Sequence, residues 1–194
     1  MKKIILFLAA GFIAISLNAQ PTFNIGLKGG ANFSKISFNI DDYSSEAVVK
    51  THIGAFGRFG GERVFLQPEV YFSGKGGDLK SGVTSLVSSF DFSTVDVPVL
   101  LGIKLIKGKS CGLNVVGGPV FSGITTKKVE DGSVFDDEFY KKHYFGVQYG
   151  LSLDLLFLTF DARIENGLNE FYRSQWSSDL KNNTFMLSVG FKLF

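Results

Sequence analysis

The chain of 194 residues is long enough for one domain with a sizeable core. Its composition, 45% hydrophobic with 23 glycines and 21 phenylalanines, is too apolar for a disordered protein and too rich in glycine and aromatics for a helical bundle. Charges nearly balance, with 20 basic and 18 acidic side chains, and Lys2 and Lys3 supply the excess, which argues against a nucleic-acid partner. Cys111 is the single cysteine, so an intrachain disulfide is excluded.

The N-terminal stretch "MKKIILFLAAGFIAISLNAQ" has the layout of a secretory signal. Two lysines precede an apolar run over residues 4–17, and the small residue Ala19 follows just before Gln20. The run is shorter than the roughly 20 apolar residues that a membrane-spanning helix needs. We therefore predict a cleaved signal peptide over residues 1–19, export of the protein, and one mature domain over residues 20–194.

Strict alternation of apolar and other residues dominates the rest of the chain. In "TFMLSVGFKLF", for example, Phe185, Leu187 and Val189 point one way and Ser188 and Gly190 the other. Such alternation indicates strands with two different faces. Eight segments show it: residues 23–34, 49–60, 63–74, 94–105, 111–123, 144–155, 158–167 and 184–194. An even number of antiparallel strands fits a closed barrel, which has no unpaired edge.

Long and short connections alternate between these segments. The long ones cover residues 35–48, 75–93, 124–143 and 168–183, and the short ones cover residues 61–62, 106–110 and 156–157. A strand of about eleven residues tilted near 45° climbs about 25 Å, the height of the apolar band of an outer-membrane barrel. We predict an all-β fold, an eight-stranded antiparallel up-and-down transmembrane β-barrel, with its long loops outside the cell and its tight turns in the periplasm.

One face of the segments is apolar and carries almost no charge, which suits contact with lipid, whereas the other face holds glycines and charges. The second face carries five basic and five acidic residues: Lys28, Arg58, Lys104, Arg163 and Lys192 against Glu69, Asp96, Asp154, Asp161 and Glu165. The interior of an eight-stranded barrel is just wide enough for side chains to fill it. We predict that these charges pair and plug the lumen; alternatively, some of them reach water at the rims unpaired.

Several stretches resemble the PorT-type, "porin family" outer-membrane β-barrel proteins of Bacteroidota. They are the leader ending "NAQ", "GLKGGANFS", "LQPEVYFSGKGG", "VDVPVLLGIKL", "DARIENGLNE" and the terminal aromatic after "GFKL". The resemblance covers residues 21–194 and implies an outer-membrane protein inserted by the barrel-assembly machinery. It implies no functional residue, because the family includes secretion-system components as well as barrels of other kinds.

Chemically reactive residues are few. We expect His52 and His143, near the outward ends of their strands, to be ordinary polar rim residues, so no catalytic residue is assigned. The acidic stretches 41–42 and 136–138 lack the spacing of a calcium loop. "GKGG" (74–77) lacks the Lys-Ser/Thr ending of a phosphate loop and is interpreted as a flexible strand exit. No metal and no cofactor is expected.

The leading functional hypothesis is a small barrel that acts through its loops, in envelope integrity, surface contact or as an accessory of a secretion or uptake complex. Its expected partners are outer-membrane lipid and lipopolysaccharide, whose phosphates four lysines of the third long loop could contact: Lys127, Lys128, Lys141 and Lys142. Two alternatives stay open. One is a rim-located outer-membrane enzyme acting on lipid or peptide, and the other is a secreted, lipocalin-like barrel that carries an apolar ligand.

Overall fold

The computed structural model describes residues 22–37, 43–46, 48–81, 87–108, 110–129, 143–168 and 181–193. The predicted signal peptide and Phe194 lie outside this set. Nine strands cover most of the described chain: β1 (Thr22–Ser37), β2 (Tyr43–Glu46), β3 (Val48–Gly60), β4 (Val64–Ser81), β5 (Val87–Lys107), β6 (Cys111–Val129), β7 (His143–Leu155), β8 (Leu158–Gly167) and β9 (Lys181–Lys192). Among these residues no helix is long and apolar enough to cross a membrane.

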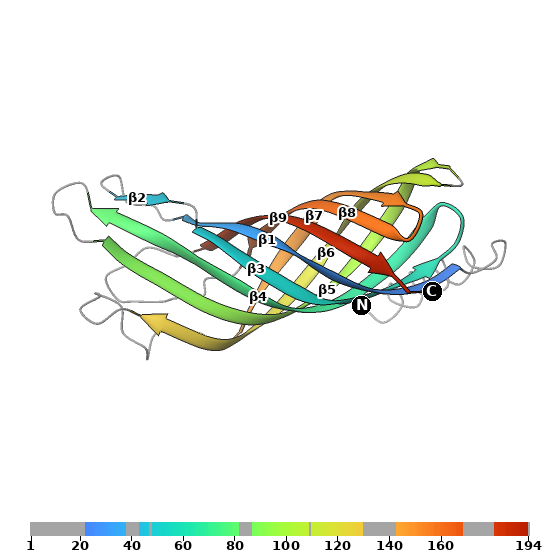
Figure 1. The fold of residues 1–194 in the computed structure, drawn as a ribbon. Helices are drawn as coiled ribbons and strands as arrows, with labels where there is room; N and C mark the ends of the chain where they lie inside the picture. The colour runs from blue at the N-terminus through green and yellow to red at the C-terminus, as the bar shows by residue number, and fades with distance from the viewer. Residues whose placement is uncertain are drawn as a thin grey trace, which may run out of the picture.

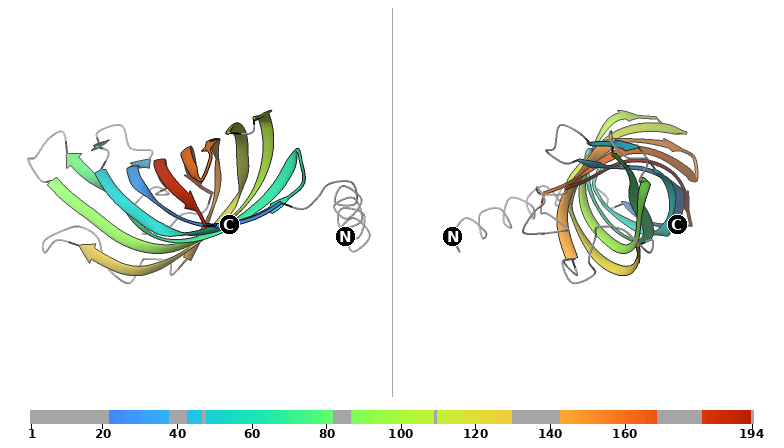
Figure 2. Two further views of the ribbon diagram at one scale, coloured as in Figure 1. Left: turned by 45° about the vertical axis from the view of Figure 1, so that its right-hand side comes forward. Right: turned by 90° about the vertical axis from the view of Figure 1, so that its left-hand side faces the viewer.

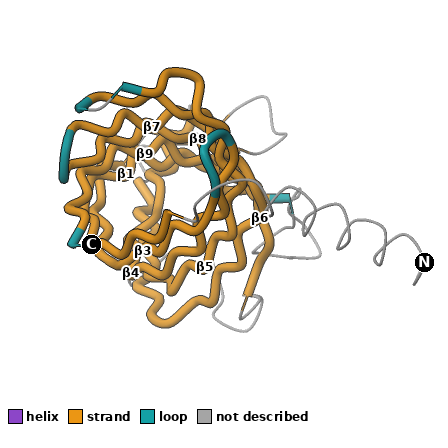
Figure 3. The backbone as a smooth tube through the Cα atoms, turned by 90° about the vertical axis from the view of Figure 1, so that its right-hand side faces the viewer, coloured by secondary structure: helices purple, strands orange, loops and turns teal. Residues whose placement is uncertain are grey.

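The strands form a closed barrel (Figures 1 and 3). Every pairing is antiparallel, and the last strand pairs with the first from Gly26↔Lys192 to Ser37↔Lys181. The pairing of β4 with β5 completes the ring of eight strands, β1 and β3 to β9. The short β2 lies outside the ring and pairs with the end of β4, through Glu46↔Asp78. The predicted eight-stranded antiparallel barrel is confirmed.

The outer wall of the barrel is apolar and the inner wall is polar. On β9, Leu187 and Val189 are 44% and 49% exposed, whereas their neighbour Ser188 is buried. The same alternation runs through β7 and β8, where every buried position is flanked by more exposed ones. A contiguous exposed apolar surface of this extent indicates a lipid-contacting wall. The orientation expected for the apolar face is therefore the one found.

Several strands continue beyond the predicted segments. Residues 75–93 were expected to form a long loop, yet β4 and β5 stay paired from Gly74↔Ser93 to Lys80↔Val87. β6 likewise continues to Val129. Alternation marks a strand only where one face meets lipid, for about ten residues. Beyond that band both faces can be polar while the backbone ladder goes on, so hydropathy misses these extensions.

The two ends of the barrel differ in their connections (Figure 2). At one end, here called the short-turn end, tight links join β3 to β4, β5 to β6 and β7 to β8. In the first of these, the Gly61 amide donates to the Val64 carbonyl oxygen at 2.9 Å. The last is a two-residue turn in which Leu156 has a positive φ of 53°. The other end, where β1, β4, β6 and β8 end, is here called the long-connection end after the longer stretches of sequence that follow these strands.

Candidate functional site

Among the described residues, the lumen holds three clusters of charged side chains, one after another along the barrel axis. The central cluster consists of Lys28 on β1, Glu69 on β4, and Asp161 and Arg163 on β8, each at most 4% exposed. The Lys28 ammonium lies 2.9 Å from Glu69 and 2.8 Å from Asp161. The Arg163 guanidinium lies 2.9 Å from Glu69 and 3.0 Å from Asp161. Each cation therefore bridges both carboxylates.

Charge stoichiometry explains why this cluster can stay ionised away from water. Moving a charged side chain out of water costs roughly several kcal/mol, unless close opposite charges and hydrogen bonds compensate this cost. Two cations meet two carboxylates here, and the Gln67 amide also donates to Glu69 Oε1 at 2.6 Å. The cluster joins strands that are not neighbours in the sheet, and so it ties opposite walls of the barrel together.

A second cluster lies on the long-connection side of the central one and is built around Lys75. The Lys75 ammonium is 2.9 Å from Asp96 and 2.5 Å from Glu165, and it donates to the Tyr144 hydroxyl at 2.7 Å. The Gln148 amide donates to Glu165 Oε2 at 2.7 Å. All five side chains are at most 1% exposed. This part of the lumen is filled by polar side chains that contact one another, although Asp96 Oδ1 and Gln148 Oε1 accept no hydrogen bond from the described residues.

Lys75 was missed by the sequence analysis, which assigned "GKGG" to a flexible strand exit. The structure corrects this: Lys75 lies within β4 and is fully buried. Its position had a signal, because it continues the inward phase of Glu69, Tyr71 and Ser73. The cation is required in the lumen, since Asp96 and Glu165 would otherwise be two buried carboxylates without a counter-charge.

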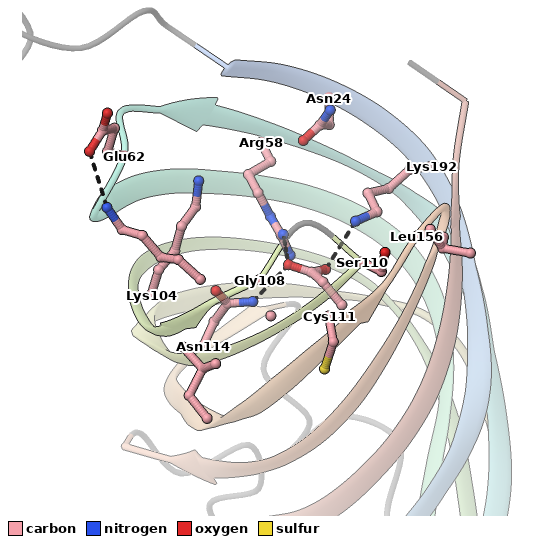
Figure 4. Close-up of a pocket in the computed structure, with 14 residues that line it drawn as sticks. Asn24, Arg58, Glu62, Lys104, Gly108, Ser110, Cys111, Asn114, Leu156 and Lys192 are labelled. Carbon is pink, nitrogen blue, oxygen red and sulfur yellow. Dashed lines mark hydrogen bonds and ion pairs between the residues drawn. The ribbon is translucent and has the colours of Figure 1, made fainter.

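The third cluster, at the short-turn end, is less complete (Figure 4). Asp154 accepts from Arg58 at 2.6 Å and from Asn114 at 2.8 Å, and the Lys192 ammonium is 3.3 Å from its other oxygen. The Lys104 ammonium donates to the Gly61 carbonyl oxygen at 3.2 Å instead of to a carboxylate. Within the described residues Lys104 forms no ion pair with a carboxylate. It is only partly buried at the mouth of the barrel, so the turn carbonyl and water can solvate its ammonium group.

His52 and His143 were both expected at the rim, and the structure separates them. His143 is exposed, with its ring 5.8 Å from that of Phe121. His52 is instead buried in the lumen, where its ring nitrogens lie 2.7 Å from Asn32 Oδ1 and 2.8 Å from Ser188 Oγ. The inward phase of β3 places His52 inside the barrel, two residues along the strand from Gly54. The expectation for His52 was therefore wrong.

The proposed lipopolysaccharide contacts stay a prediction. Lys128 pairs with Asp91 in the backbone ladder of β6, beside Lys127, but neither side chain is described. Lys141 and Lys142 lie outside the described residues, as do the acidic stretches 41–42 and 136–138. In the part of the chain that the structure describes, no group of three His, Cys, Asp or Glu residues could hold a metal ion.

A closed eight-stranded barrel with an apolar outer wall and a charged lumen defines the class of small outer-membrane barrels. A family model described as "Outer membrane protein beta-barrel domain" matches residues 18–173 of the chain. The chain belongs to this family. The resemblance seen in the sequence is thus confirmed at the level of the outer-membrane barrel family, and the outer membrane is the location that this membership supports.

Solved structures of outer-membrane proteins share the fold. The outer membrane protein OprG from Pseudomonas aeruginosa superposes with a TM-score of 0.56 at 12% identity, over 90% of this chain and 96% of that one. Neisserial surface protein A (NspA) superposes with a TM-score of 0.52 at 11% identity, over 90% and 99%. Identities this low establish the architecture alone. No curated protein matches the sequence significantly.

Proposed function

We propose that the protein is a non-conducting outer-membrane barrel, a rigid anchor whose activity lies at its ends and not in a pore. The central cluster carries this proposal, because Lys28, Glu69, Asp161 and Arg163 reach across the lumen and leave each other almost no exposure to water. Moving an ion past them would require breaking buried ion pairs. A barrel of eight strands is just wide enough for its own side chains.

The long-connection end is proposed to face outward, as in bacterial barrels with short periplasmic turns. Paired strands extend there well past the segments that show alternation, through Lys80↔Val87 on β4 and β5. We propose that these extended strands provide a surface that contacts lipopolysaccharide or a secretion or uptake complex, or that contributes to envelope integrity. We further propose insertion by the barrel-assembly machinery and a place among the PorT-type, "porin family" barrels of Bacteroidota.

Conductance across a planar lipid bilayer tests the proposal. The purified protein should give no large steady current, while an open porin inserted into the same bilayer should conduct. Correct insertion is verified beforehand by gel electrophoresis, in which a folded barrel migrates differently before and after boiling. A large steady current through folded protein would overturn the sealed lumen.

Orientation can be tested with Cys111, the single cysteine of the chain. It is exposed at the start of β6, at the short-turn end. A bulky maleimide that does not cross the outer membrane should leave Cys111 unlabelled in intact cells and label it after lysis. Equal labelling in intact cells would reverse the proposed orientation.

One observation favours a second candidate function, the outer-membrane hydrolase. Ser188, His52 and Asn32 form a hydrogen-bonded chain in the order serine, histidine, amide, which resembles the arrangement in serine and cysteine hydrolases. Burial counts against it: Ser188 is 5% exposed and Asn32 is fully buried. A nucleophile needs an opening for its substrate, and the chain of contacts also suits a structural role inside the barrel.

A fluorophosphonate probe, which reacts with activated serines, separates the two functions. The structural role predicts no labelling of the folded protein, and no change in lipid or peptide hydrolysis when His52 is replaced by alanine. Labelling that disappears in both Ser188→Ala and His52→Ala would establish the hydrolase. The soluble, ligand-carrying barrel is not favoured, because its lumen would have to be apolar, whereas here the lumen holds charges and the apolar side chains face outward.

A further inference from the structure

The mouth of the barrel at the short-turn end is a pocket with an excess of positive charge (Figure 4). Its volume is about 480 Å³. Four cationic side chains line it against two carboxylates: Arg58, Lys104, Lys107 and Lys192 against Glu62 and Asp154. Two positive charges therefore stay uncompensated among the residues that line it. Low-dielectric walls around such an excess raise the local concentration of anions.

Arg58 is the buried member of this set and is held in one orientation. Its Nε donates to Gln67 Oε1 at 2.7 Å, and its Nη1 donates to Asp154 Oδ2 at 2.6 Å. The guanidinium also lies over the Phe65 ring, 4.4 Å from the ring centroid. These three contacts fix the plane of the guanidinium, so little conformational freedom is lost when it meets a ligand.

The remaining nitrogen of Arg58 has no hydrogen-bond partner among the described residues. Nη2 is buried, and the residue as a whole is 3% exposed. Buried donors in proteins are nearly always satisfied. Arg163 Nε in the central cluster is also unpaired, but Arg58 differs in that it lines a pocket, where a ligand can reach the side chain. An anion in the pocket would supply the missing acceptor and two-pronged contacts of the kind that guanidinium makes with phosphate.

Lysines complete the arrangement around Arg58. Lys104 donates only to the Gly61 carbonyl among described partners, so most of the capacity of its ammonium is uncommitted. Lys192 shares Asp154 with Arg58 at 3.3 Å, and Lys107 pairs with the exposed Glu62 at the same distance. Flexible ammonium groups beside one fixed guanidinium suit a ligand with more than one negative charge.

We propose that this mouth binds a small multivalent phosphate-bearing anion, with Arg58 Nη2 as its principal donor and Lys104 and Lys192 as supporting cations. The central cluster closes the lumen beyond the pocket, so the anion binds at the mouth and does not pass through. The site is independent of whether the lumen conducts and of which compartment the short-turn end faces. Its phosphate is either that of a soluble anion or that of a lipid headgroup.

Native mass spectrometry of the folded protein in detergent tests the site. One arm uses inorganic pyrophosphate and the other short-chain phosphatidylglycerol. We expect a single adduct in at least one arm. Its apparent Kd should rise at least tenfold in Arg58→Gln and by a smaller, measurable factor in Lys104→Gln. The second variant matters because Lys104 supports no carboxylate, so folding should survive its loss even if Arg58→Gln folds poorly.

Arg63→Gln is the matched control. It removes one positive charge from an exposed position in the turn between β3 and β4, and Arg63 does not line the pocket. Its affinity should stay within about twofold of the parent. A pyrophosphate adduct assigns the site to a soluble anion, and an adduct with the lipid alone assigns it to a headgroup. No adduct in either arm, or an equal loss in Arg63→Gln, would overturn the proposal.

Discussion

The central cluster and the short-turn mouth are built from the same types of charged side chain but differ in their balance of charge. In the centre, Lys28 and Arg163 each contact both Glu69 and Asp161, and all four are buried. At the mouth, Asp154 is the one carboxylate that Arg58 and Lys192 share. In the first arrangement two cations balance two carboxylates, whereas the lining of the second holds four cations against two carboxylates.

The difference shows that stoichiometry and access to water separate a structural charge cluster from one that can bind. Buried ions must be neutralised inside the protein, so the central cluster has no capacity for a ligand. Ions near water tolerate an imbalance, because solvent screens them. A positive excess is therefore sustainable at the mouth and would be prohibitive at the level of the central cluster.

The largest effect should follow from breaking the central cluster. Glu69→Ala leaves Lys28 and Arg163 to share Asp161 alone, and we expect a loss of about 3–5 kcal/mol in the free energy of unfolding. Urea unfolding in phospholipid vesicles, followed by the folded band on unheated gels, measures it. A loss below about 1 kcal/mol would mean that water already compensates these charges, contrary to their burial.

A charge on the outer wall should cost nearly as much. Leu187 is 44% exposed on β9, level with Ala31 and Ala162 on the neighbouring strands. Leu187→Arg, in the middle of β9, should lower the free energy of unfolding by about 2–4 kcal/mol, the cost of an arginine at mid-depth in the bilayer. Leu105→Arg, near the end of β5, is the matched control and should lose about 0–1 kcal/mol. The same urea titration checks both, and equal losses would contradict the lipid-facing wall.

Overpacking the lumen wall beside Arg58 should have an intermediate effect on the free energy of unfolding. A Cβ atom on Gly102 would overlap the ring of Phe65, the residue on which Arg58 stacks. Gly102→Ala should therefore destabilise by about 1–3 kcal/mol through overpacking. Phe65→Leu combined with Gly102→Ala should recover part of this loss, which a double-mutant cycle of unfolding free energies reveals. Simple additivity would show that the ring moves aside freely.

The smallest effect should come from the mouth. Lys104→Gln removes a cation whose described partner is one carbonyl, so the free energy of unfolding should stay within about 0.5 kcal/mol of the parent. Against the large loss expected for Glu69→Ala, this result would separate a charge that holds the barrel from one that is available to a ligand. A loss of 2 kcal/mol or more, roughly, would indicate that Lys104 is part of a compensated network.

Much of this architecture could be predicted from local pattern. The alternation that places Leu187 outward and Ser188 inward identified eight strands, and it put Lys28, Glu69 and Arg163 on one face. The same rule failed where its physical basis ended. It lost β4 after Gly74, because both faces of the strand are polar there, and so it missed Lys75. It also placed His52 at a rim that the strand extensions moved further out.

The sequence by itself determined which side chains face lipid and which face the lumen, because that choice follows from a two-residue period within each strand. Only the tertiary structure decided which charges meet. Lys28 and Glu69 stand 41 residues apart on strands that are not neighbours in the sheet, and Lys75 and Glu165 stand 90 apart. Such contacts depend on how closure staggers one strand against another, and no local period encodes that stagger.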